Sequence, residues 1–198
     1  HCNWMYVRGK FSDAQIKWLK DNQYIVNGHF DFSERALAKM SGTTRMGNYL
    51  SVVGDTARLQ GLVPGVLWTF IENMSWDEFY AEIPQNLVDL ARKFLEIVKI
   101  QYEIVGHWSK APVDKATLAE ALKYSPVQIT IPFEERHATN LIAVDDIWPY
   151  TVYDHYDPFI YTQNANFQIG TAVKTYVSIR DNTPRTLKLC LPIYMFGS

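Results

Sequence analysis

Two side chains in the second half of the chain, His137 and Asp154, have the types and the spacing needed for proton transfer. His137 opens the stretch "HATNLIAVDD", and Asp154 follows the alternating residues "TVY". If these stretches form adjacent antiparallel strands, the start of the first lies opposite the end of the second. A carboxylate that hydrogen-bonds one imidazole nitrogen fixes the tautomer and orientation of the ring, so that the other nitrogen can serve a nucleophile. The sequence therefore predicts a His137–Asp154 pair.

Other interpretations of the same segment stay open. Asp157, directly before Pro158, is the rival carboxylate, and Asp154 could be a turn former because "DHYDP" is rich in turn residues. We favour Asp154 because it directly ends the alternation. Asp154, His155 and Asp157 could also bind a metal, but the sequence has no second ligand cluster with suitable spacing, so neither a metal nor another cofactor is expected. A histidine at the start of a strand is more often structural than catalytic.

The first half of the sequence has the periodicity and the caps of short helices. Ser12, Ser33 and Ser75 each stand at the start of an amphipathic stretch, as N-cap residues do. Gly61 follows a further periodic stretch, and Pro84 interrupts the longest one. The predicted helices span residues 2–9, 12–22, 31–42, 46–64 and 75–100. In the fourth of these, the side chains expected to face inward are Leu50, Val53, Ala57 and Leu59.

The second half changes to the alternating, β-branched pattern that is typical of strands. Strands are expected at residues 100–108, 127–133, 137–146, 149–156 and 167–179, with one helix at 114–126 and an apolar tail at 186–198. Helices followed by strands predict an α+β fold. We place the boundary after residue 108, with a mainly helical lobe at 1–108 and a β-rich lobe at 109–198 that together form one domain.

Five stretches, taken in this order, resemble the papain-like cysteine peptidases: "FSERALAKMSGTT", "MGNYLSVVGDTARLQGLVP", "LAEALKYSPVQITI", "HATNLIAVDD" and "TVYDHY". The first of them looks closer to papain-like proteins of the type encoded by bacteriophages than to papain. The resemblance covers residues 1–180 and is carried by the order and spacing of the stretches together. It implies a two-lobed papain-like fold, in which a helical N-terminal lobe packs on an antiparallel sheet or barrel lobe.

The resemblance assigns a role to several residues. His137 matches the catalytic histidine of the family, which acts as base and then as acid, and Asp154 matches the group that orients it. Backbone N–H groups and an upstream glutamine hold the oxyanion in this family. The residues that the resemblance places along the substrate cleft are Gly47, Asn48, Val127 and Tyr156, the last of which would shield the catalytic pair from water.

The nucleophile of the family lies at the N-terminus of a long helix, where the helix dipole and free N–H groups favour a thiolate. The stretch "CNW" resembles the family's "CW" and would make Cys2 the nucleophile. Gly9, however, ends this helix barely two turns after Cys2, at ~3.6 residues per turn, whereas the family's helix continues for several turns. The spacing therefore favours a chain that starts inside the helix and lacks the nucleophile segment, with Cys2 as a small buried residue.

The composition of the sequence restricts the binding partners and the cellular compartment that we expect for the protein. The 19 basic and 21 acidic residues leave a net charge of −2 without a long basic run, so nucleic acid is not an expected partner. No apolar run approaches the ~20 residues of a membrane span, so a membrane is not expected either. The two cysteines, Cys2 and Cys190, cannot build a dense disulfide framework, which fits a reducing compartment such as the cytoplasm of an infected bacterium or a virion.

Three functions are compatible with these observations. The principal hypothesis is a papain-like cysteine peptidase that hydrolyses peptide bonds of a peptide or protein substrate by a Cys-His-Asp mechanism. The first alternative is a catalytically inactive papain-like module that serves as a structural or assembly protein of the phage virion, packed against other virion subunits. The second alternative is a phage peptidoglycan hydrolase of related fold.

Overall fold

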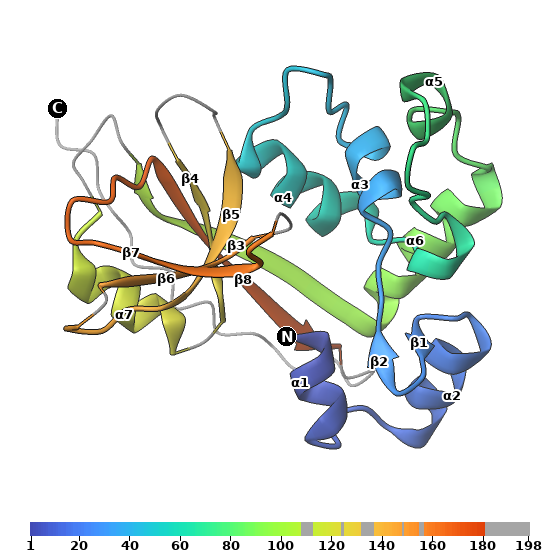
Figure 1. Ribbon diagram of the computed structural model, residues 1–198. Helices are drawn as coiled ribbons and strands as arrows, with labels where there is room; N and C mark the ends of the chain where they lie inside the picture. The colour runs from blue at the N-terminus through green and yellow to red at the C-terminus, as the bar shows by residue number, and fades with distance from the viewer. Residues whose placement is uncertain (108–112, 124, 132–136, 148, 155–156, 181–198) are drawn as a thin grey trace, which may run out of the picture.

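A helical first half and an antiparallel sheet in the second half make up the structure, which is a computed structural model (Figure 1). It describes residues 1–107, 113–123, 125–131, 137–147, 149–154 and 157–180. The predicted α+β class is therefore confirmed. The helices are α1 (Cys2–Val7), α2 (Asp13–Asp21), α3 (Glu34–Met40), α4 (Leu50–Gln60), η1 (Gly65–Leu67), α5 (Trp76–Phe79), α6 (Gln85–Ile97) and α7 (Lys115–Leu122). The strands are β1 (Ile25–Val26), β2 (His29–Phe30), β3 (Val98–His107), β4 (Val127–Thr130), β5 (Ala138–Ala143), β6 (Tyr150–Tyr153), β7 (Ile160–Gln163) and β8 (Thr171–Ile179).

Serine caps start three of the helices, as the sequence predicts. The side chains of Ser12 and Ser75 each accept a hydrogen bond from the third residue of the helix that follows, and both complete a capping box. Ser33 accepts from the backbone N–H of Ala36 and donates to the carbonyl of Trp68. Each cap satisfies an N–H group that the helix itself cannot pair, so the starts of α2, α3 and α5 are set locally.

The C-terminus of α4 is fixed by Gly61, the predicted end of that helix. Gly61 has a φ of 85° and approaches α6 so closely that a Cβ atom at this position would lie 1.9 Å from the carbonyl oxygen of Ala91. The expected inward face of α4 is wrong in one position, because Leu59 is 62% exposed. Leu59 lies two residues beyond Ala57, which turns it by about 200° around the helix and away from the core.

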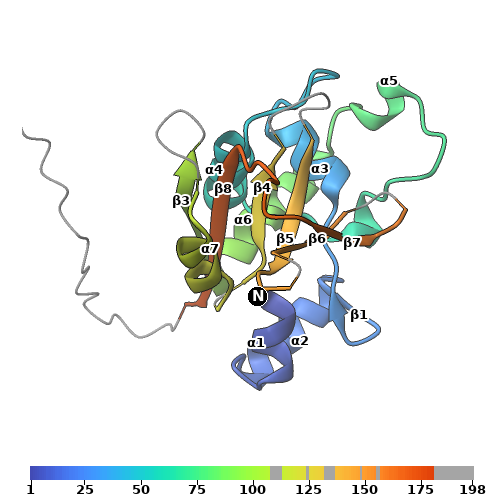
Figure 2. The ribbon, with the colours of Figure 1, turned by 60° about the vertical axis from the view of Figure 1, so that its left-hand side comes forward.

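The sheet has six strands in the order β3-β8-β4-β5-β6-β7, and every neighbouring pair is antiparallel. β3 precedes the boundary expected after residue 108, yet it forms an edge of the sheet through a long pairing with β8. The strands β1, β2 and β7 are additional to the predicted ones. Helix α7 lies on one face of the sheet, and α4 and α6 lie on the other (Figure 2).

The core of the helical half is built around two fully buried rings, Tyr24 and Phe94. These rings stack with their centroids 4.6 Å apart, and Phe32 meets Phe94 edge-on at 5.4 Å. The Tyr24 hydroxyl lies 2.9 Å from the carbonyl oxygen of Leu62 and 3.0 Å from that of Leu90. A polar atom in the middle of this core is therefore paired, and the phenol links α6 to the segment after α4.

A second core lies between α7 and the sheet. Leu118 and Ala121 of α7 pack with Val127, Leu141 and Val152, which belong to three successive strands. All five side chains are almost completely buried. This core fixes the register of β4, β5 and β6, because a slip of one residue would turn every apolar side chain to the opposite face.

Replacing Phe94 by alanine should lower the free energy of unfolding by about 3–5 kcal/mol, since it removes a fully buried ring and leaves a cavity beside Tyr24. The measurement is urea denaturation followed by circular dichroism. Leu59→Ala is the control, because an exposed helix position should change the free energy by less than about 0.5 kcal/mol. Similar losses in both variants would contradict this description of the core.

Candidate active site

His137 and Asp154 are held by adjacent strands and point to the same face of the sheet. The backbone N–H of Ile131 donates to the carbonyl of His137 over 2.8 Å, which extends the β4–β5 ladder to the residue before β5. Leu141 of β5 pairs with Val152 of β6. His137 and Asp154 lie an even number of residues from these two, so the alternation of side chains places all four on one face.

The two side chains form a short contact. Nε2 of His137 lies 2.8 Å from Oδ1 and 2.8 Å from Oδ2 of Asp154. The imidazole is 18% exposed and the carboxylate only 6%. Burying a carboxylate costs free energy unless hydrogen-bond donors surround it. The contact therefore stabilises the buried Asp154 side chain as well as orienting the ring. Because Asp154 engages Nε2, Nδ1 is the ring nitrogen directed elsewhere.

Asp154 has further partners in the hairpin that follows it. Its backbone N–H donates to the carbonyl of Phe159 over 2.8 Å, and the Tyr161 hydroxyl donates to Oδ2 over 3.3 Å. Sequence reasoning missed Tyr161 because it missed β7. The short alternation "FIYTQ" after Pro158 was the only available signal.

Of the other residues that the sequence offered as a carboxylate or as metal ligands in this segment, Asp157 is the one that the structure describes, and it does not share the position of Asp154. Asp157 is exposed in the turn between β6 and β7, away from the buried position that Asp154 occupies. His155 and Tyr156 lie outside the described residues. Within the described part of the chain, no group of three or more His, Cys, Asp or Glu side chains is arranged to hold a metal ion.

Cys2 is a buried residue at the start of α1. Its side chain is 7% exposed, and burial raises the pKa of the thiol to about 11. A buried thiol of this kind is inert at neutral pH, since the thiolate is the reactive form. Cys2 lines a pocket that also includes Asn140, whose side chain points to the face of β5 opposite to that of His137. The structure therefore does not bring Cys2 to the His137–Asp154 pair.

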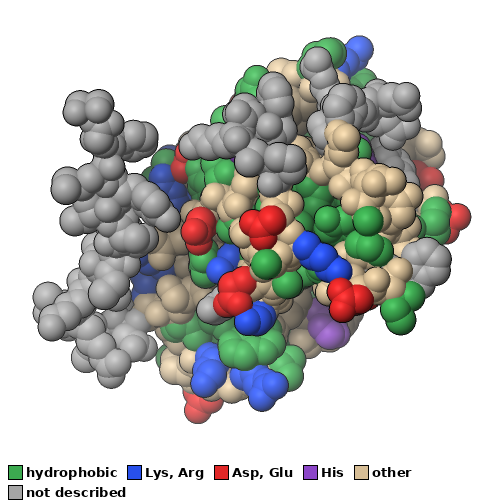
Figure 3. All heavy atoms as spheres, turned by 90° about the vertical axis from the view of Figure 1, so that its left-hand side faces the viewer, with side chains coloured by type: hydrophobic (Ala, Val, Ile, Leu, Met, Phe, Trp, Pro, Cys, Tyr) green, Lys and Arg blue, Asp and Glu red, His purple; other side chains and the backbone are tan. Residues whose placement is uncertain are grey.

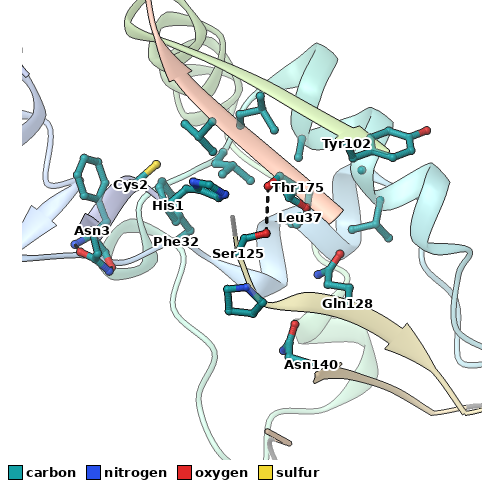
Figure 4. A pocket seen from close by; sticks show the side chains of 18 residues that line it. His1, Cys2, Asn3, Phe32, Leu37, Tyr102, Ser125, Gln128, Asn140 and Thr175 are labelled. Carbon is teal, nitrogen blue, oxygen red and sulfur yellow. Dashed lines mark hydrogen bonds between the residues drawn. The ribbon is translucent and has the colours of Figure 1, made fainter. Parts of the chain in front are cut away.

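The pocket that Cys2 lines has a volume of about 370 Å³ and lies between the helical half and the sheet. Figure 4 shows Cys2 and Asn3 at one end and Tyr102 at the other, with Gln128 and Asn140 along one side. Val53, Gly54 and Ala57 of α4 contribute an apolar wall. The pocket thus begins at the N-terminus of α1 and continues as an apolar groove with a polar side on β4 and β5.

The residues expected along a substrate cleft differ in their exposure to solvent. Gly47 and Asn48 are exposed, and the Asn48 amide donates to the carbonyl of Ser41 over 2.9 Å, which braces the loop before α4. Val127 is instead fully buried in the core beneath α7, so its side chain cannot contact a substrate. The fourth expected residue, Tyr156, is not among the described ones.

Comparison with known proteins gave no family model, no curated protein and no solved structure that matches the chain.

In the part of the chain that the structure describes, no helix is long and apolar enough to cross a bilayer. On the side of the molecule where α7 lies, acidic and basic side chains are interspersed with hydrophobic ones (Figure 3). That face therefore carries charge of both signs.

The raised pKa of Cys2 predicts a pH dependence of stability. A thiol that ionises less readily when folded stabilises the protein fully below its unfolded pKa of 9.0, and this contribution is lost as pH rises to about 11. The loss should be at most about 2–3 kcal/mol. It would be measured as the difference in unfolding free energy between Cys190→Ser and Cys2→Ala/Cys190→Ser chains. A difference that stays constant from pH 8 to pH 11 would contradict the burial of this thiol.

Proposed function

We propose that the protein is a papain-like cysteine peptidase, or the domain of one, in which His137 and Asp154 form the catalytic pair. The observation that supports this proposal best is the contact of Nε2 with a buried carboxylate on the neighbouring strand. A rigid sheet holds both backbones, and the carboxylate fixes the ring, as a general base requires. The α+β arrangement of the chain agrees with the two-lobed fold of such enzymes.

In the proposed reaction, Nδ1 of His137 accepts the proton of a cysteine thiol, and the thiolate attacks the carbonyl carbon of a peptide bond. The imidazolium then donates this proton to the leaving amine, and the acyl group stays on sulfur as a thioester. A water molecule, deprotonated by the same nitrogen, attacks the thioester and releases the carboxylic acid and the thiol. Asp154 stabilises the imidazolium that forms in both halves of the reaction.

Cys2 does not suit the role of nucleophile in this reaction, because its thiol is buried and lies on the Asn140 side of β5. We propose that the reactive thiol is carried by chain that precedes His1, in a helix continuous with α1. Two to three turns would place such a thiol about 11–16 Å from Cys2 and away from the position in which Cys2 is buried.

A second function is favoured by one observation. The thiol of Cys2, the cysteine among the described residues, is buried and lines the pocket on the Asn140 side of β5, so it does not serve His137 as a nucleophile. The protein would then be an inactive module of papain-like fold that serves assembly, with subunits of a virion as partners.

A thiol-directed probe on the full-length gene product separates the two functions. If the protein is a peptidase, His137→Ala should lower the labelling rate by about 10²–10⁴-fold, because the base that activates the thiol is lost. Asp154→Ala should lower it by at least about tenfold.

Asp157→Ala is the matched control, because it removes an exposed carboxylate from the same turn and should leave the rate unchanged. Equal effects of the two Asp substitutions would exclude Asp154 as the orienting residue. A full-length product that is not labelled at all would favour the assembly function.

A further inference from the structure

Asp154 lies between two side chains that approach it from opposite neighbours in the sheet. Leu141 of β5 and Tyr161 of β7 both pair with Val152 of β6, two residues before Asp154. Tyr161 is therefore a diagonal neighbour of Asp154 on the same face, at a separation that a long aromatic side chain can span. His137 approaches from the β5 side, and the phenol approaches from the β7 side.

The contact with His137 does not distinguish the two oxygens of the carboxylate. Nε2 is equidistant, at 2.8 Å, from Oδ1 and Oδ2. The terminal torsion of an aspartate is broad and has no strongly preferred rotamer. The Tyr161 hydroxyl, on a third strand, donates to Oδ2 over 3.3 Å, and this bond favours one orientation of the carboxylate.

The phenol is itself held by structure that does not depend on the side chain of Asp154. Tyr161 is half-buried and packs against the core that contains Leu118 and Val152. The β6–β7 ladder sets its register, and the Asp154 N–H bond to the Phe159 carbonyl ties the ends of the two strands together. The hydroxyl is thus presented from a fixed position.

We propose that Tyr161 is a positioning residue, which orients the carboxylate of Asp154 and through it the imidazole of His137. Three adjacent strands, β5, β6 and β7, then contribute one side chain each to a connected series of hydrogen bonds. The catalytic consequence rests on the proposed peptidase function, whereas the ordering of the imidazole does not. The two can therefore be tested separately.

The experiment uses Tyr161→Phe, which removes the hydroxyl and keeps the ring that packs in the core. The readout is the exchange with water of the His137 ring N–H proton, followed by NMR and assigned by its loss in His137→Gln. The acceptor is a charged carboxylate, but the bond is long at 3.3 Å, so we expect it to contribute about 1.5 kcal/mol and exchange to become about tenfold faster. Tyr153→Phe, which removes an exposed hydroxyl on the other face of β6, is the control and should leave exchange unchanged.

Unchanged exchange in Tyr161→Phe, or equal acceleration in both variants, would overturn the inference. A wild-type protein without a protected His137 N–H would also overturn it, because there would be no ordered imidazole for Tyr161 to hold. Faster exchange in Tyr161→Phe, combined with no labelling of the full-length thiol, would support the positioning role and reject the peptidase. Labelling that requires His137 but not Tyr161, with exchange unchanged, would reject only the positioning role.

Discussion

The burial of the Asp154 carboxylate is the constraint on which the second half of the structure depends. A carboxylate at this depth must be surrounded by donors, and here these include the His137 ring just before β5 and a hydroxyl on β7. Such an arrangement is possible only if three strands keep their register, since a slip of one residue would move Asp154 to the opposite face. The apolar core under α7 holds this register, so packing and polar geometry support each other.

Helix α4 packs closely at two glycines, one against the sheet and one against α6. A Cβ atom on Gly54 would lie 2.8 Å from the Tyr102 ring, so α4 can lie against β3 at this distance only with glycine. In the same way, the absence of a side chain at Gly61 allows α4 to approach α6 closely. These two contacts set the position of α4, and with it the width of the groove that begins at α1. The groove is therefore a consequence of fixed packing.

Local signals in the sequence predicted local structure well. The caps Ser12, Ser33 and Ser75 and the helix end at Gly61 depend on a few neighbouring residues, and all four are confirmed. The contact of His137 with Asp154 followed from the alternation of two strands. Strand β7 could not be found in this way, because a four-residue edge strand that is only half-buried is stabilised by its partner and has little pattern of its own. Tyr161 was missed with it.

The chemistry of a thiol peptidase makes opposite demands on its two principal groups. The imidazole must be enclosed and oriented, and the burial of His137 beside Asp154 meets that demand. The thiol must ionise easily, whereas burial raises the pKa of Cys2 to about 11. A residue cannot be both a well-packed part of α1 and a ready nucleophile. The environment of Cys2 is therefore that of a core residue, and in the proposed peptidase the reactive thiol would approach from the side of the imidazole that Nδ1 faces.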